Sequence, residues 1–264
     1  MLRKIYDFLF RMSKLADVYV AALSHPAQKI WALVLITVVF AGLGRGMRGV
    51  TTRGAVAGAA ACFAILWGAG FPGFAVLIAV FLLTWATTRI GYLHKQRLGI
   101  AEARIGRDER QVLANLGVAA LCSLVHTFES HELRLLVAMG AALAEAAADT
   151  ISSEIGQALG GAPRLITNWR QVPAGTDGGV TFAGTLAGSV GAVLVILVGA
   201  LTGLFRWRFL PLCAAAAVAG MLVDSVLGAT LERRNVLGNN AVNFISTAIS
   251  AVLAFLFSQV LGPL

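Results

Sequence analysis

Three acidic residues lie in or beside apolar segments of the chain, where an ionised side chain is costly. Asp149 and Glu154 belong to the run ADTISSEIG (148–156), and Asp224 stands in the apolar run GMLVDSVLG (220–228). A charge inside a membrane costs about 2.5–3.5 kcal/mol on insertion scales, so such residues mark functional sites by default. Carboxylates from different helices commonly hold Mg²⁺ against phosphate oxygens. We therefore predict that all three are metal ligands and catalytic residues, the alternative for Asp149 being an arginine partner that only joins helices.

A loop between these acidic segments has the composition of an anion site. The run PRLITNWRQVPAGTDGGVT (163–181) contains Arg164 and Arg170, followed by a glycine-rich turn. Glycines let backbone N–H groups approach a phosphate, and the helix that follows presents its positive end. We predict that the two arginines are catalytic and that the turn binds a nucleotide through Gly175, Thr176, Gly178 and Gly179. A plain turn before a membrane span is the alternative, and the loop lacks the Gly-Lys-Ser/Thr ending of a Walker A motif.

Two polar stripes accompany the acidic segments and the loop. Arg107, Gln111 and Asn115 recur at every fourth position, which places them on one face of a helix. Asn239 and Asn243 form a second stripe, with Asn240 beside it. Hydrogen bonding between helices, at about 0.6 kcal/mol each, would explain such residues without a ligand. Because both stripes fall on the same predicted side as the loop, we assign them to nucleotide binding.

The elements that must position these residues are membrane helices. Of the 264 residues, 58% are hydrophobic and only 13% are charged, whereas a soluble domain carries about a quarter charged residues. This composition excludes a soluble globular protein. The formal net charge of +8 is then typical of loops that face anionic lipid rather than of nucleic-acid binding.

Apolar segments of about 20 residues, the length that crosses a bilayer, predict an all-α polytopic membrane protein. We expect a bundle of about seven or eight transmembrane helices in one catalytic domain, residues 28–264, preceded by an amphipathic N-terminal helix within residues 1–27. The expected spans are 28–44, 50–69, 72–91, 111–127, 133–151, 180–203, 209–231 and 240–262. Glycines four residues apart, such as Gly184 and Gly188, predict close helix packing.

The distribution of basic residues predicts the orientation. If alternate loops share a side, one side receives only Arg134, Arg206 and Arg208, and the other receives the basic residues of 45–53, 89–110, 164–170 and 233–234. The positive-inside rule places the richer side, with the predicted site, in the cytoplasm. If residues 28–44 cross the membrane, the outside receives Arg3, Lys4, Arg11, Lys14 and Lys29. The alternatives are that this span re-enters the membrane or that the amphipathic N-terminus contributes to the crossing. We expect a multi-pass protein of the cell (inner) membrane.

Five sequence blocks resemble a known family. They are GRDERQVLANLGVAA (106–120), ADTISSEIG (148–156), PRLITNWRQVPAGTDGGVTFAGTLAG (163–188), VDSVLGATLE (223–232) and NNAVNFISTAISA (239–251). In this order they resemble the integral membrane family called domain of unknown function 92, or transmembrane protein 19, whose plant chloroplast member phosphorylates phytyl phosphate. The loop is also similar to the glycine-rich signature of CTP-dependent dolichol and phytol kinases and of membrane cytidylyltransferases.

The resemblance implies phosphorylation of an isoprenoid monophosphate (phytyl, farnesyl or geranylgeranyl phosphate) to its diphosphate, with Mg²⁺ and a nucleoside triphosphate, CTP by preference. The acidic, arginine, glycine-loop and asparagine motifs of the family map onto the residues named above. Asn240 stands where the family often has an acidic residue, which removes one possible ligand, and Glu145 is an extra carboxylate without an assigned role. A homodimer is compatible with this reading.

Phosphoryl transfer needs little covalent help from a protein, because positioning and charge stabilisation carry the catalysis. The substrate phosphate is itself the nucleophile, so the chemistry does not call for a catalytic histidine. Two other readings remain open. One is a cytidylyltransferase that acts on a lipid phosphate, and the other is a transporter that uses the buried carboxylates for ion coupling.

Overall fold

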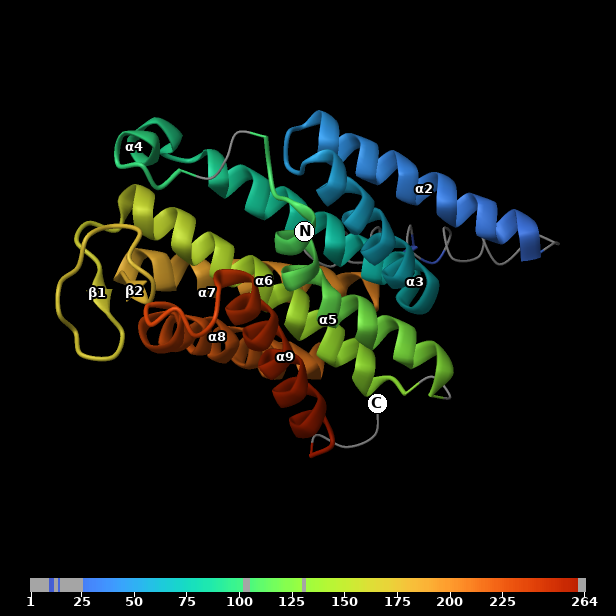
Figure 1. Ribbon diagram of the computed structural model, residues 1–264. Coiled ribbons are helices and arrows are strands. Elements are labelled where there is room, and N and C mark those ends of the chain that lie inside the picture. The colour runs from blue at the N-terminus through green and yellow to red at the C-terminus, as the bar shows by residue number, and fades with distance from the viewer. Residues whose placement is uncertain (1–9, 12–13, 15–25, 102–104, 130–131, 261–264) are drawn as a thin grey trace.

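The computed structural model describes residues 10–11, 14, 26–101, 105–129 and 132–260, and its apolar helices pack side by side in a bundle (Figure 1). The amphipathic helix expected within residues 1–27 lies almost wholly outside the described residues. Seven of the described helices are long and apolar enough to cross a membrane, which confirms the all-α polytopic architecture. They come from α2 (Pro26–Gly46), α3 (Thr52–Arg89), α5 (Glu109–Phe128), α6 (Arg134–Leu159), α7 (Phe182–Thr202), α8 (Leu210–Leu227) with its flanking turns, and α9 (Asn239–Ser258).

Helix α3 is two antiparallel legs joined at Gly70. A straight helix of its 38 residues would be about 57 Å long. Instead, Arg89 at its end donates a hydrogen bond of 2.8 Å to the carbonyl of Met47, five residues before its start. The chain reverses at Gly70, whose φ of 62° and ψ of −158° favour glycine, and Pro72 follows. The legs correspond to the expected spans 50–69 and 72–91.

The reversal brings the connections before α3 and before α5 to one end of the bundle. Val50 and Arg107 form an isolated parallel bridge, in which the Thr51 N–H donates to the Arg107 carbonyl at 2.9 Å. The Arg107 N–H in turn donates to the Gly49 carbonyl at 3.1 Å. Residues 47–51 and 105–108 therefore lie on the same side of the membrane, as the alternation of basic loops requires.

Helix α6 runs through the centre of the bundle, in contact with α3, α5, α7, α8 and α9 (Figure 1). Its alanine-rich sequence is almost completely buried, and small residues on its neighbours allow the close approach. A Cβ on Gly184 would lie 2.5 Å from the Ser152 carbonyl, and one on Gly188 would lie 2.6 Å from the Ala148 carbonyl. The glycine spacing thus confirms the expected packing and seats α7 on the face of α6 next to Asp149.

Capped helix starts and short connections gather at the end of the bundle that holds the predicted site. The Asp108 side chain forms a capping box with Gln111 at the start of α5, and Thr181 caps α7. The short helix α4 (Tyr92–Arg97) and a two-stranded antiparallel hairpin of β1 (Arg164–Leu165) and β2 (Gly179–Val180) lie at this end (Figure 1). A single turn, η1 (Trp207–Phe209), precedes α8, and a π-helical turn, η2 (Gly228–Glu232), follows it.

Candidate functional site

A polar cavity of about 260 Å³ opens among the ends of α5, α6, α8 and α9 and the loop before α7. Most of the residues predicted from the sequence line it, although they come from five separate segments of the chain. Those residues are Arg107, Gln111, Asn115, Asp149, Glu154, Gly175, Thr176, Gly178, Gly179, Asp224, Asn239 and Asn243. The fold therefore brings the predicted acidic, glycine-rich and asparagine segments together, and leaves out Arg164, Arg170 and Asn240.

Asp149 of α6 and Asp224 of α8 face each other at the inner end of the cavity, close enough for their carboxyl groups to interact directly. Asp224 also accepts a hydrogen bond of 3.2 Å from the Ser246 hydroxyl. With its amide nitrogen turned toward Asp224, Asn243 lies 3.2 Å from the same carboxylate oxygen. Helix α9 thus orients Asp224 through two side chains, one turn apart.

Two further carboxylates line the cavity, and the sequence interpretation did not assign them. Asp177 lies between Thr176 and Gly178 in the glycine-rich turn, and Glu232 ends the π-helical turn after α8. None of the ion pairs formed within the described part of the chain involves Asp149, Asp177, Asp224 or Glu232. The spacing of Glu232 from Asp224, eight residues or about two helical turns, was the signal that could have found it.

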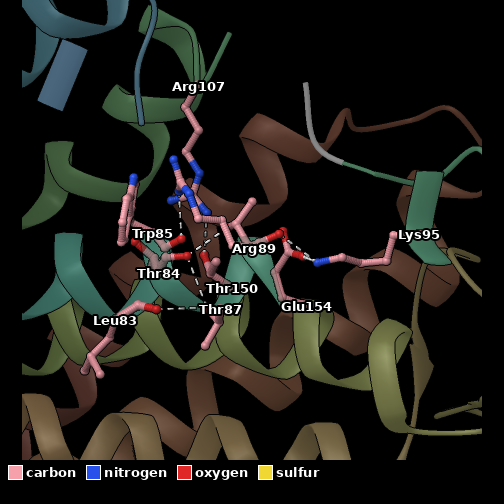
Figure 2. Close-up of polar contacts among 10 residues, drawn as sticks. Leu83, Thr84, Trp85, Thr87, Arg89, Lys95, Arg107, Thr150 and Glu154 are labelled. Atoms are coloured by element: carbon pink, nitrogen blue, oxygen red, sulfur yellow. Dashed lines mark hydrogen bonds and ion pairs between the residues drawn. The ribbon is translucent and has the colours of Figure 1, made fainter. Parts of the chain in front are cut away.

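Among the described residues that line the cavity, Arg107 is the basic one. Its guanidinium donates a hydrogen bond of 3.1 Å to the Thr150 hydroxyl, beside the Asp149 carboxylate (Figure 2). The Arg107 backbone is held by the bridge to Val50, and Gly106 before it has φ 87°. A Cβ on Gly106 would lie 2.5 Å from the Val50 nitrogen, so glycine is required at this position for the two segments to pair.

Glu154 lines the cavity but is already engaged by a cation. Its carboxylate forms a buried ion pair with Lys95 of α4, which also donates to the Thr88 carbonyl at 3.0 Å (Figure 2). Lys95 is fully buried. The expectation that Glu154 would share a metal with Asp149 and Asp224 is therefore not matched by the geometry, since this carboxylate turns toward α4 at the edge of the cavity.

The glycine-rich turn forms one wall of the cavity. Gly175 and Gly178 have φ of 81° and 71°, backbone conformations that glycine adopts readily. A Cβ on Gly175 would meet Ile100 at 2.5 Å, and a Cβ on Gly178 would overlap Ala229 of η2. The Thr176 hydroxyl donates 2.7 Å to the Pro173 carbonyl. The turn thus packs closely between the segment after α4 and the π-helical turn.

Arg164 and Arg170 do not enter the cavity, contrary to the sequence expectation. Residues of a strand alternate between its faces, and in β1 the buried position is Leu165, so Arg164 is exposed and donates 2.9 Å to the Trp169 carbonyl. Arg170 is also exposed. Asn240 misses the cavity for a similar reason, because it follows Asn239 by one position on α9 and points to another face.

The donor set fits a magnesium ion that is completed by a phosphate-bearing ligand. Among the residues that the structure describes, no three His, Cys, Asp or Glu side chains are grouped to hold a metal alone. Mg²⁺ is usually bound by one or two carboxylates together with waters and substrate phosphates, rather than by an all-protein cage. Asp149 and Asp224 provide such a pair, with Asp177 and Glu232 adding negative charge to the same cavity.

Comparisons with known proteins place this chain in a family. Residues 35–251 match the family described as integral membrane protein DUF92. An uncharacterized membrane protein of Methanocaldococcus jannaschii is 33% identical over 229 residues, which cover 86% of this chain and 94% of the relative. An uncharacterized membrane protein of Synechocystis sp. is 37% identical over 195 residues, covering 72% and 76% of the two chains.

A plant relative is more distant. The chloroplastic protein VTE6 of Arabidopsis thaliana is 29% identical over 198 residues, which cover 72% of this chain and 60% of the relative. No solved structure matches the chain. The family match spans every wall of the polar cavity, from Ile100 to Asn243. On this match, the chain is a multi-pass integral membrane protein that belongs to the DUF92 family.

Proposed function

We propose that this protein is a prenyl-phosphate kinase, which transfers a phosphoryl group from a nucleoside triphosphate to an isoprenoid monophosphate. The observation that carries the proposal is the polar cavity, whose described lining brings five carboxylates, one of them paired with Lys95, and one arginine together at one end of an apolar bundle. Such an excess of acidic groups suits a magnesium nucleotide, whose metal offsets their charge. The family resemblance to a plant phytyl-phosphate kinase supports the acceptor class, and CTP is the first donor to test.

Each group of cavity residues has a separate task in this proposal. Asp149 and Asp224 would hold Mg²⁺, which would supply positive charge to offset the phosphates of the donor. The turn from Gly175 to Gly179 covers the nucleotide with its backbone N–H groups. Asn239 and Asn243 present amide groups to the same ligand from α9. Arg107 lines the cavity, so it takes the role of neutralising the phosphates. The sequence assigns that role to Arg164 and Arg170, which are exposed.

The transfer itself balances without a protein nucleophile. An oxygen of the acceptor monophosphate forms a bond to the γ-phosphorus, and the bond from that phosphorus to the bridging β-oxygen breaks. The nucleoside diphosphate leaves with the electron pair. Arg107 stabilises the charge on the transferred group, and in-line placement of the two ligands accounts for the remaining rate enhancement. We place this reaction at the cytoplasmic face of the inner membrane, where the basic loops lie under the positive-inside rule.

The decisive assay measures diphosphate formation by the purified full-length protein. Phytyl, farnesyl and geranylgeranyl phosphate are each incubated with Mg²⁺ and with CTP, ATP, GTP or UTP. We expect the prenyl diphosphate and a nucleoside diphosphate as products, with loss of both when EDTA removes the metal. If no combination yields a diphosphate, the proposal is wrong. A lipid nucleotide with release of pyrophosphate would instead identify a cytidylyltransferase, and ion-coupled transport without nucleotide binding would identify a transporter.

A further inference from the structure

A second cavity, of about 120 Å³, lies between α2, α3 and α5 and adjoins the polar cavity. The two cavities share Arg107, Gln111 and Asn115 in their linings. Asn115 donates a hydrogen bond of 2.8 Å to the Gln111 carbonyl, one turn earlier on α5. These three residues therefore form a polar partition with one cavity on each side.

The second cavity is apolar over most of its surface. Its walls include Leu77, Val80 and Phe81 from the second leg of α3 and Val112 and Leu116 from α5. Helix α2 closes one side with Phe40, whose ring packs edge-on against the Phe81 ring at 5.7 Å. Figure 1 shows α2 alongside α3 at the margin of the bundle. The cavity is thus suited to a hydrocarbon that enters from the bilayer.

Glycines provide the depth of this cavity. Gly58 lies in its lining, and the nearest atom to a Cβ built there is a Val112 methyl at 3.9 Å. At Gly44 the nearest atoms are from Phe81 and Val50, both at 3.6 Å. These are ordinary contact distances, so a methyl group would be tolerated at either position. The absence of a side chain is therefore not required by helix packing, and it leaves room for a ligand.

The charged residues around the polar cavity are mostly acidic, whereas those around the apolar cavity are basic. The described lining of the apolar cavity holds Arg48, Arg89 and Arg107 and no acidic side chain. Arg89 donates to the carbonyls of Met47 and Trp85, at 2.8 Å and 3.0 Å, and its guanidinium lies 3.7 Å from the Trp85 ring centroid. Figure 2 shows Arg89 and Trp85 with Arg107 above Thr150. An apolar cavity with arginines at its polar end matches an amphiphile that has an anionic head.

We propose that the apolar cavity binds the tail of a lipid monophosphate with a single chain and presents its phosphate at Arg107. This inference rests on the proposed function, because it assigns the acceptor to one cavity and the magnesium nucleotide to the other. Arg107, which lines both cavities, then contacts the acceptor phosphate beside the Asp149 carboxylate. The cavity has a volume of only about 120 Å³, so we assign it one hydrocarbon chain rather than the two chains of a phospholipid.

Photolabelling locates the tail without depending on catalysis. A farnesyl phosphate analogue with a diazirine near the end of its tail is irradiated with the full-length protein in nanodiscs, and labelled peptides are identified by mass spectrometry. We expect label on residues 77–81 and 112–116, and displacement by geranylgeranyl phosphate but not by farnesol or phosphatidic acid. Label spread over the outer faces of α7 to α9, or equal competition by phosphatidic acid, would overturn the proposal.

A substitution within the cavity tests the same assignment by tail length. We expect Gly58→Leu to lower kcat/KM for geranylgeranyl phosphate by about tenfold, since displacing about two methylene groups from apolar contact changes affinity by that factor. Activity with the short dimethylallyl phosphate should stay within about twofold of wild type. Gly42→Leu is the matched control, because Gly42 is exposed on α2 and nothing lies within 4 Å of its built Cβ. Equal loss with both tails, or with the control, contradicts the proposal.

The two proposals fail in different ways. If no nucleotide yields a diphosphate but the tail probe labels residues 77–81 and 112–116, the kinase assignment is wrong and the lipid-phosphate cavity stands. If diphosphate forms while Gly58→Leu and the milder Gly58→Ala leave tail selectivity unchanged and the label falls elsewhere, the kinase assignment stands and the cavity assignment is wrong. Because labelling uses the wild-type protein, misfolding of a variant does not decide the outcome.

Discussion

Lys95 and Glu154 form an ion pair that joins α4 to the central helix α6 below the surface of the protein. The side chain of Lys95 is 1% exposed and that of Glu154 is 10% exposed. Gly91 allows α4 to pack closely on α6 beside this pair, since a Cβ on Gly91 would lie 2.8 Å from the Ala158 Cβ. The pair fixes the segment that carries Ile100 over the glycine-rich turn. It therefore holds Ile100, which lines the polar cavity, against the glycine-rich turn.

Removing one partner of this pair should destabilise the protein. We expect Lys95→Met to lower the free energy of unfolding by about 3–5 kcal/mol, because it leaves a buried carboxylate without its cation. The double variant Lys95→Met with Glu154→Leu should recover much of this loss, since it leaves no charge behind. Thermal unfolding in detergent measures both, and a double variant no more stable than the single one would show that the pair itself is not the cause.

Asp149 and Asp224 should be the carboxylates that the metal requires. We expect Asp149→Asn and Asp224→Asn each to weaken Mn²⁺ binding by more than about 10–100-fold, the loss seen when even a group behind a metal ligand is changed. Ser246→Ala, which removes the hydroxyl that donates to Asp224, should weaken Mn²⁺ binding by about 10–100-fold. Electron paramagnetic resonance titration gives these affinities. Glu129→Gln, an exposed change before α6, is the control and should match wild type.

Arg107 and Arg164 should differ in their effect on phosphoryl transfer. We expect Arg107→Met to lower kcat/KM by about 10²–10³-fold, comparable with the loss of one donor that stabilises transition-state charge. Arg164→Met, at an exposed position whose guanidinium contacts the Trp169 carbonyl, should change it by less than about threefold, as for an ordinary surface substitution. Steady-state diphosphate assays decide between them. The reverse ranking would restore the assignment made from sequence alone.

Gly178 and Gly161 make a matched pair, because their φ angles are 71° and 70°. Nothing lies within 4 Å of a Cβ on Gly161, whereas one on Gly178 overlaps Ala229. Alanine at either position should cost about 1–2 kcal/mol in the left-handed conformation. Only Gly178→Ala should also displace the turn from η2 and raise the KM for the nucleotide. Calorimetry and nucleotide titration separate the shared strain from the specific effect, and an equal KM in both variants would contradict the assignment.

The helices and most of the cavity residues could be predicted because their signals are local. Apolar length marks the spans, and the helical repeat places Gln111 with Asn115 and Asn239 with Asn243. The ion pair of Lys95 with Glu154 could not be predicted, since 59 residues separate them and only the packing of α4 on α6 brings them together. The exposure of Arg164 depends on a two-residue strand, which is too short to leave an alternating pattern in the sequence.

The residues of the glycine-rich turn could be predicted only in part. Its glycines were recognisable by type, and the structure places Gly175 and Gly178 in the cavity wall. The sequence does not single out Asp177, although it lies between them, because a glycine-rich turn that follows two arginines is typical of an anion site. The Asp177 carboxylate adds negative charge to that wall. This charge favours a nucleotide that binds together with a metal ion over a free nucleotide.

The reversal of α3 at Gly70 also bears on how the protein enters the bilayer. Residues 54–88 contain no charged side chain, and the basic residues Arg53 and Arg89 stand at the two open ends of the hairpin. The closed end can therefore cross the hydrocarbon layer first, without carrying an ion through it. Both legs can then insert as one unit, and the chain resumes on the side from which it started. Biosynthesis of this segment needs no translocated loop, only the insertion of one compact pair.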